Sequence, residues 1–344
     1  MLRAAFGSSG LEVAAEFTTL TGEPQSTTTS PNRLPLYIGD EDIRGMLYIT
    51  APLSAPASAA EAEPTSADIE PSDEHATDAV AATAPPAAVQ FVHDGLTLEL
   101  EGVVTTTTGD RIVFLSTCVK LARAGTLAAV PGGDPLVFGF QINNLDKPHE
   151  SYVGSNVTVA YLLRLVASKP RKLLGSAGAR AKHEFSIWVA NYQVPPERNP
   201  PLVIEFGFDD VLKVELEYAQ SKFALDDVLV GRLYFETVRI AIDSIALSLV
   251  RVESVVHGPG TLRKSRPIFY HEITDGAPVH GEAVPIRIFL DDFPLTPTYK
   301  NIHNVFSVKY VLNIIVVDDA DRRYFKQQEI VLWRPPPGDL IELE

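Results

Sequence analysis

The chain has 344 residues, of which 45% are hydrophobic, and it carries a formal net charge of −15 at neutral pH. A single hydrophobic core stops growing at roughly 250–300 residues, so this length indicates two domains. The negative charge argues against non-specific binding to nucleic acid or to anionic membranes, because phosphate groups are bound by clustered lysine and arginine.

Several features of the sequence indicate a cytosolic protein. No stretch approaches the roughly 18 uninterrupted apolar residues of a membrane-spanning helix. Residues 1–10 lack the roughly 7–15 apolar residues at the centre of a signal peptide. The single cysteine, Cys118, cannot form an internal disulfide, which indicates a reducing compartment. We expect Cys118 to be a buried, small apolar residue; a reactive thiol is the alternative.

The first part of the chain reads as short strands with one long insertion. Residues 11–17 form one expected strand, and residues 34–50 form two strands around an acidic turn. Residues 53–88 are dominated by Ala, Pro, Ser and Thr and contain seven acids but no Lys or Arg. Such a segment buries too little apolar surface to offset its ordering entropy, which predicts a disordered insert between two strands. It is either a tolerated surface loop or an interaction or phosphorylation segment.

Past the insert, short strands continue to Tyr192. Residues 96–101 alternate apolar and polar side chains, the period of two that places one set on a core face. A basic cluster over residues 169–183 interrupts the strands. This cluster is either a solvated hairpin loop or an electrostatic contact to phospholipid or to an acidic partner.

The segment 194–201, VPPERNPP, is the expected domain boundary. Its four prolines lack the N–H groups that a strand ladder needs, and they stiffen the connection. We therefore expect an N-terminal β-sandwich over residues 1–193 and a C-terminal β-sandwich over residues 202–344. Within the second, the apolar phase slips along residues 238–249, which predicts a β-bulge near Asp243-Ser244.

The clearest strand pattern lies near the C-terminus. Along residues 306–316 one apolar set recurs at every second position, an acidic turn follows at residues 318–321, and residues 324–334 return as a second strand that Pro335 must end. The sequence therefore predicts a hairpin. With no convincing helix and no internal repeat found by inspection, we expect an all-β fold of two antiparallel sandwiches in tandem.

The chain carries no recognisable catalytic or metal-binding motif. It lacks the GxSxG, GxxxxGK[ST] and HExxH patterns, and its histidines are dispersed. Acidic pairs at residues 209–210, 226–227, 291–292 and 318–319 occupy expected strand ends, where we interpret them as solvated turns. Catalytic carboxylates or calcium ligands are the alternative, but the spacing of a calcium loop is missing. We expect no catalytic residue, metal, cofactor or enzymatic activity.

Several long words occur together in one order, among them KPHESYVGSNVTVAY, FGFDDVLKVELEY, DGAPV and RRYFKQQEIVLWR. On these words the chain closely resembles the vacuolar protein sorting-associated protein 26 family, the arrestin-like small subunit of the retromer coat. The resemblance covers most of the chain from about Leu34 onward, with one interruption. It implies two arrestin-like β-sandwiches and a non-enzymatic adaptor in endosome-to-Golgi and plasma-membrane retrieval of transmembrane cargo. The alternatives are an arrestin-type adaptor of a different trafficking complex and a β-sandwich hydrolase or metal-dependent enzyme.

The resemblance implies a binding site for the large α-solenoid subunit, vacuolar protein sorting-associated protein 35. The implied residues are Ile273, Thr274, Asp275 and Gly276, in a segment where Asp275-Gly276 and Pro278 demand a turn. Ile273 would be an exposed apolar knob on that turn. The family pattern has methionine where this chain has Thr274, which makes the knob smaller. The alternative is an isoleucine that packs on its own sheet.

A second implied site is an edge between the domains, where cargo tails or sorting nexins would meet Phe206, Tyr324 and Phe325. A sandwich edge suits strand addition, because the backbone supplies affinity and alternate side chains supply selection. Phe206 replaces a smaller aliphatic residue of the family pattern, and core aromatics are the alternative. The implied location is the cytoplasm, peripheral on endosome membranes, with indirect membrane contact, no nucleic acid and no cofactor.

Overall fold

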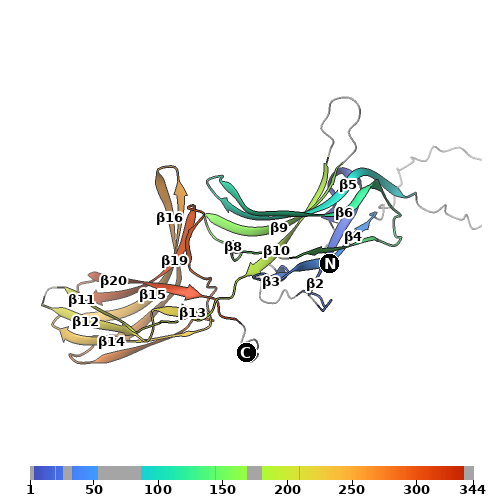
Figure 1. Cartoon of the computed structure of the whole chain (residues 1–344). Coiled ribbons are helices and arrows are strands. Elements are labelled where there is room, and N and C mark those ends of the chain that lie inside the picture. Colours follow the sequence, from blue (N-terminus) through green and yellow to red (C-terminus); the bar gives the residue numbers. More distant parts are fainter. Residues whose placement is uncertain are drawn as a thin grey trace, which may run out of the picture.

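The computed structural model describes residues 4–19, 21–25, 33–52, 87–143, 145–168, 180–208 and 210–336. Within these ranges the chain consists of strands and loops, with one 3-10 turn at Gly7–Ser9 and no α-helix. Residues 53–86 of the expected insert and residues 169–179 of the basic cluster lie outside the described residues. The two halves of the chain form two separate layered β units that meet at one end (Figure 1).

The N-terminal unit pairs a four-stranded sheet with a six-stranded sheet. Its strands are β1 (Ala4–Ala5), β2 (Glu12–Thr18), β3 (Leu36–Ile38), β4 (Ile43–Thr50), β5 (Val89–Thr106), β6 (Arg111–Ala129), β7 (Leu136–Ile142), β8 (Tyr152–Val153), β9 (Val157–Ser168) and β10 (Arg180–Ala190). The small sheet has the order β1-β2-β4-β7. The large sheet has the order β3-β10-β9-β5-β6, and β8 also pairs with β9.

The C-terminal unit has the same architecture. Its strands are β11 (Leu202–Phe208), β12 (Leu212–Tyr218), β13 (Lys222–Ala224), β14 (Val228–Val238), β15 (Ile242–His257), β16 (Gly260–Asp275), β17 (Ala283–Phe289), β18 (Tyr299–Ile302), β19 (Phe306–Asp318) and β20 (Arg323–Trp333). The sheet orders are β11-β12-β14-β17 and β13-β20-β19-β15-β16, and β18 also pairs with β19.

The two units have the same strand order: adding ten to each strand number of the N-terminal sheets gives the order of the C-terminal sheets. The chain therefore contains a structural repeat that its sequence does not reveal. The tandem all-β, arrestin-like fold is thus confirmed. The ladders are antiparallel apart from one short parallel pair in each unit, β3 with β10 and β13 with β20.

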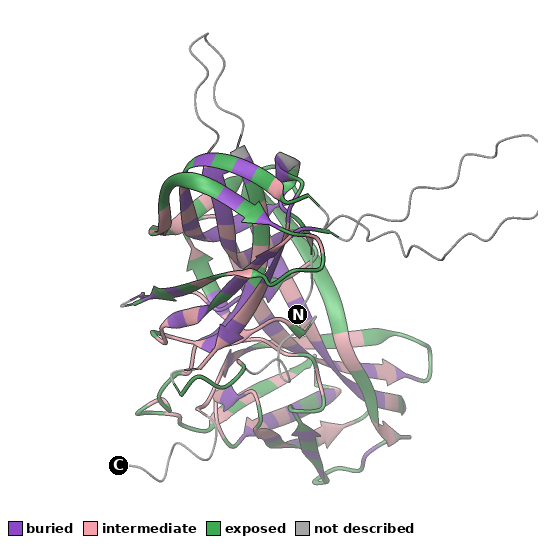
Figure 2. Cartoon of the chain, turned by 90° about the vertical axis from the view of Figure 1, so that its right-hand side faces the viewer, coloured by how far each residue is buried: buried purple, intermediate pink, exposed green. Residues whose placement is uncertain are grey.

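Strand alternation builds the two cores. In β19 every second residue is buried along the whole strand, and Figure 2 shows the same alternation of buried and exposed residues across both units. Each fully buried Leu, Ile or Phe side chain contributes roughly 1.5–3 kcal/mol relative to exposure. The predicted C-terminal hairpin is confirmed, with Tyr310 opposite Ile330. The predicted bulge is confirmed too, because the register of β15 against β19 shifts between Ile242 and Ser244.

A third apolar cluster joins the two units. Its N-terminal members come from β5, β8 and β9, and its C-terminal members come from β15, β18 and β19. The buried residues are Val104, Tyr152, Val157, Val159, Val255, Tyr299, Phe306 and Val308. Because this cluster excludes water between the units, the polar groups around it must find partners within the protein.

Glu253 is one of these buried polar groups, with 2% of its surface exposed. Its carboxylate accepts hydrogen bonds from the Tyr152 hydroxyl at 2.9 Å and from the backbone N–H groups of Ser155 and Asn156 at 2.9 and 3.0 Å. A Cβ on the intervening Gly154 would lie 2.7 Å from both carboxylate oxygens. Glycine at this position therefore lets a loop of one unit close around an acid of the other.

Two further contacts cross between the units. Arg334, just after β20, donates from Nε to both carboxylate oxygens of Glu150, at 3.1 and 2.9 Å. The Nε2 atoms of His149 and His303 lie 2.9 Å apart, and the ring of Phe114 stacks on that of His303. One histidine must donate and the other accept, so this contact requires at least one neutral ring.

Two expectations about single residues are wrong. Cys118 is exposed, because it lies on the solvent face of β6. Asp318 is 1% exposed and is not a solvated turn residue. Its carboxylate accepts hydrogen bonds from the backbone N–H groups of Ala320 and Arg322, so it organises the turn between β19 and β20 from inside.

Candidate binding groove and turn

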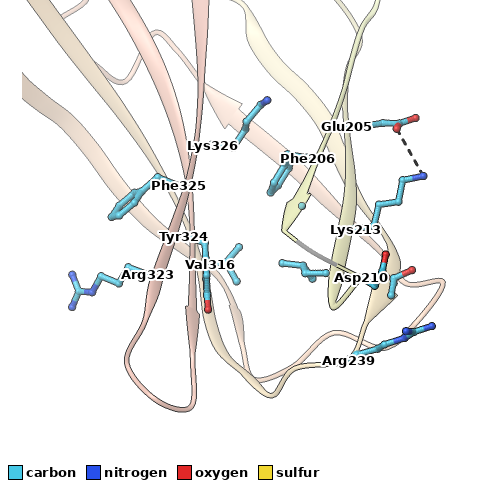
Figure 3. A pocket seen from close by; sticks show the side chains of 13 residues that line it. Glu205, Phe206, Asp210, Lys213, Arg239, Val316, Arg323, Tyr324, Phe325 and Lys326 are labelled. Carbon is cyan, nitrogen blue, oxygen red and sulfur yellow. Dashed lines mark ion pairs between the residues drawn. The ribbon is translucent and has the colours of Figure 1, made fainter.

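The structure brings Phe206, Tyr324 and Phe325 to one groove of about 1010 Å³. The groove lies between the two sheets of the C-terminal unit, so the expected position between the domains is wrong. Figure 3 shows Phe206 and Tyr324 reaching into the groove from opposite walls, while Phe325 points to the other face of β20. The lining residues are Glu205, Phe206, Gly207, Asp210, Leu212, Lys213, Thr237, Arg239, Val316, Arg323, Tyr324, Phe325 and Lys326.

Both walls of the groove end in open strand edges. Among the described residues, β11 forms a ladder with β12 alone. Residues 323–330 of β20 pair only with β19, because β13 reaches no further than Val331–Trp333. An open edge presents unpaired N–H and C=O groups, which are a template for another extended chain.

The three aromatic residues differ in how they are held. Phe206 and Tyr324 are partly buried and pack against the core of the C-terminal unit. Phe325 is 62% exposed on the other face of β20, so it is available to a partner that lies along the open edge of this strand. Phe206 and Tyr324 are therefore in part core residues, as the alternative interpretation expects, whereas Phe325 is not a core residue.

Asp318 fixes the position of Tyr324. The Tyr324 hydroxyl donates to Asp318 Oδ2 at 3.1 Å, and Arg322 Nε donates to the same oxygen at 2.7 Å. Burial by itself would raise the pKa of the Asp318 carboxyl, but the hydrogen bonds from Arg322 and Tyr324 outweigh it and hold the pKa below its ordinary value. The carboxylate is thus ionised at neutral pH and keeps the aromatic wall of the groove in place.

The groove is locally basic in an acidic protein. Four basic side chains, Lys213, Arg239, Arg323 and Lys326, line it together with two acids. Lys213 is paired with Glu236 at 2.6 Å, and this hydrogen bond raises its pKa. A polypeptide with acidic and apolar residues would complement both the charge and the aromatic wall.

The second implied site, at Ile273, Thr274, Asp275 and Gly276, lies at the end of β16. Ile273 is a half-buried strand residue that packs against the C-terminal core, so the expectation of an exposed knob on a turn is wrong. Thr274 is also half-buried, and its hydroxyl is buried without a hydrogen-bond partner. The turn itself begins at Gly276, whose φ of +106° is a conformation that glycine adopts without strain.

The exposed apolar residue of this turn is Val279, at 67%. Its backbone N–H donates to Glu282 Oε2 at 2.7 Å, and the neighbouring Gly281 N–H donates to the Phe235 carbonyl at 2.8 Å. The preceding Pro278 is buried. Val279 is therefore presented on a turn that is fixed on both sides. Sequence reasoning missed it, although a valine between a proline and the polar residues HGE is a usable signal.

The described residues contain no cluster of metal ligands and no membrane-spanning helix. No group of three or more His, Cys, Asp or Glu side chains could hold a metal ion there. No helix in that part of the chain is long and apolar enough to cross a membrane.

The fold defines a class: proteins of two tandem, arrestin-like β-sandwiches. The family model described as vacuolar protein sorting-associated protein 26 matches residues 59–321, and the chain belongs to that family. Vacuolar protein sorting-associated protein 26 of Dictyostelium discoideum is 41% identical over 244 residues, which are 70% of this chain and 67% of the relative. Vacuolar protein sorting-associated protein 26B of Homo sapiens is 39% identical over 251 residues, 72% of this chain and 70% of the relative.

Proposed function

We propose that this chain is the small, non-enzymatic adaptor subunit of a retromer coat, which retrieves transmembrane cargo from endosomes. Membership of the vacuolar protein sorting-associated protein 26 family supports the assembly. The observation that carries the adaptor role is the groove between the open edges of β11 and β20, because it offers backbone groups and an aromatic wall to a partner's extended segment.

The two surfaces have different partners in this proposal. The groove with Phe206, Tyr324 and Phe325 takes the cytosolic tails of cargo together with a sorting nexin. The end of β16 and the turn after it, Ile273 to Val279, bind the large α-solenoid subunit, vacuolar protein sorting-associated protein 35. Val279 is the apolar contact of that turn, since Ile273 is half-buried on its own sheet. The protein is then cytoplasmic and reaches the endosome membrane through its partners.

Co-purification with the large subunit tests the second surface. Val279→Asp places a charge at an exposed hot spot, which should weaken binding by roughly 30-fold, the equivalent of about 2 kcal/mol. Val137→Asp is the matched control, because Val137 is 52% exposed on β7 of the other unit. Equal binding by the two variants would remove the turn from the proposal.

The groove is tested separately by binding of a fluorescent cargo-tail peptide in the presence of the sorting nexin. Phe325→Asp should weaken this binding and leave the large subunit bound, whereas Val279→Asp should do the reverse. Phe289→Asp is the control, because Phe289 is 47% exposed on β17, away from the groove. Loss of both activities in either variant would indicate misfolding, which a melting curve would reveal.

A further inference from the structure

A second cavity, of about 500 Å³, lies between the two units and is distinct from the groove. Glu150, Val153 and Trp188 line it from the N-terminal unit, and Arg251, Arg266 and Ile268 line it from the C-terminal unit together with Leu295 and Arg334. Three arginines and one glutamate give this lining a formal charge of +2. Such a concentration of arginine is unexpected in a chain of net charge −15.

The cavity contains a buried arginine, Arg251, whose side chain has an unsatisfied donor. It is 8% exposed, and its Nε atom is buried without a hydrogen-bond partner. No ion pair or hydrogen bond holds its guanidinium anywhere in the described ranges; the ring of Tyr152, with its centroid 5.7 Å away, is its neighbour. A buried charged donor without a partner costs several kcal/mol, so its retention needs an explanation.

Arg266 adds a second charge beside the first. Arg251 and Arg266 are directly opposite each other in the ladder of β15 and β16, so their side chains share one face of the sheet. Like charges in this position repel. Arg266 also forms no ion pair among the described residues.

The nearby acids form no direct ion pair with these two arginines. Glu150 is occupied by Arg334, which donates to both of its oxygens. Glu253 lies two residues from Arg251 but outside the lining of the cavity, and its oxygens accept from Tyr152, Ser155 and Asn156. Glu253 keeps its charge near Arg251, but its oxygens are taken up by these three neutral donors, and Arg266 is exposed. Neither guanidinium is thus held by a direct acid partner among the described residues, and each offers the planar fork that binds an oxyanion through two hydrogen bonds.

We propose that this interdomain cavity binds a phosphate monoester carried by an extended peptide, a phosphoserine or phosphothreonine side chain. The dianion matches the +2 lining and would accept from Arg251 and Arg266 together. The apolar side chains Val153, Ile268 and Leu295 suit the flanking residues of a peptide. Residues 266–268 belong to β16, an edge strand that pairs only with β15 among the described residues, so backbone groups are available beside the cavity. An anionic membrane fits less well, because the protein as a whole is strongly acidic.

The test measures binding of the full chain to a short capped peptide that contains one phosphoserine between valines, by isothermal titration at constant ionic strength. The phosphorylated peptide should bind and the serine peptide should not. Arg266→Ala should weaken binding roughly tenfold or more, the effect of losing charge-assisted hydrogen bonds. Arg263→Ala is the matched control: Arg263 is exposed on the same strand, but it lies opposite Ser254 and so on the other face of the sheet, and its loss should change affinity by less than about twofold.

Arg251→Lys provides an independent variant, because it keeps the buried charge but removes the fork, and it too should weaken binding. Binding is also measured to inorganic phosphate and to vesicles of phosphatidic acid in phosphatidylcholine. These probes distinguish a phosphopeptide from a free phosphate ion and from a lipid headgroup. The proposal is overturned if the phosphopeptide fails to bind the unaltered chain, if Arg263→Ala and Arg266→Ala weaken it equally, or if only the vesicles or free phosphate bind.

Discussion

Replacing Glu253 by alanine tests how the two units are held together. The carboxylate is buried and serves three donors from the other unit, so its removal leaves the Tyr152 hydroxyl and the Asn156 N–H without an acceptor. Ser155 is exposed, and its N–H can recover a bond to water. Each unsatisfied buried donor costs about 1–3 kcal/mol, while relief of the buried charge returns part of this, so we expect a loss of about 2–4 kcal/mol.

Thermal unfolding followed by tryptophan fluorescence is the assay, since the two tryptophans, Trp188 and Trp333, report one from each unit. For domains of 150–250 residues each kcal/mol shifts the melting temperature by roughly 2–4 °C, so a decrease of roughly 5 °C or more is expected. Small-angle scattering should show the units separating. Glu329→Ala is the control: it removes the same charge from an exposed ion pair with Lys309 and should cost less than about 1 kcal/mol. If both variants melt and scatter alike, Glu253 does not clamp the units.

Three further predictions follow from single residues. Burial, assisted by His303, lowers the pKa of His149 below 6.5, so this group costs no stability above pH 6.5 and stability falls as the pH drops from there through the lowered pKa. His303→Asn, which suits the φ of 49° at this position, should reduce the fall below pH 6.5 in melting curves. Gly231→Ala would place Cβ 2.6 Å from the Glu217 carbonyl oxygen and should cost about 1–3 kcal/mol in urea unfolding, whereas Gly139→Ala meets only Met46 Sδ at 3.5 Å and should cost little. The thiol of Cys118 should react with a chromogenic disulfide in native buffer, and a protected thiol would contradict its exposure.

The sequence was sufficient to predict the class of fold, because a half-buried strand shows an alternation of apolar and polar residues. The alternation over residues 306–316 continues in the structure as one unbroken pattern in β19, and the phase slip near Asp243-Ser244 corresponds to a real register shift. The repeat of the two units was not visible, because two sandwiches can share strand order while sharing only the hydrophobic pattern.

Partners distant in the sequence could not be predicted in the same way. Glu253 meets Ser155 across 98 positions, and Arg334 meets Glu150 across 184. The exposure of Ile273 could not be predicted either. A turn signal lies beside it in the sequence, but β16 extends to Asp275 and places the isoleucine on the sheet. Val279 is the exposed residue instead. Only the tertiary fold decides which of two neighbouring apolar residues is presented to a partner.

The structural repeat explains why the groove with Phe206 and Tyr324 is open. In the N-terminal unit the strand equivalent to β11 is β1, which has two residues, and the turn after it lies against the edge of β10. A Cβ on Gly7 would come within 3.0 Å of the Lys182 backbone N, and Phe6 is fully buried in the core. In the first sandwich the segment around Phe6 and Gly7 thus covers part of the edge of β10. In the second sandwich the edge of β20 is uncovered between residues 323 and 330, and such an open edge is a template for an extended segment of a partner.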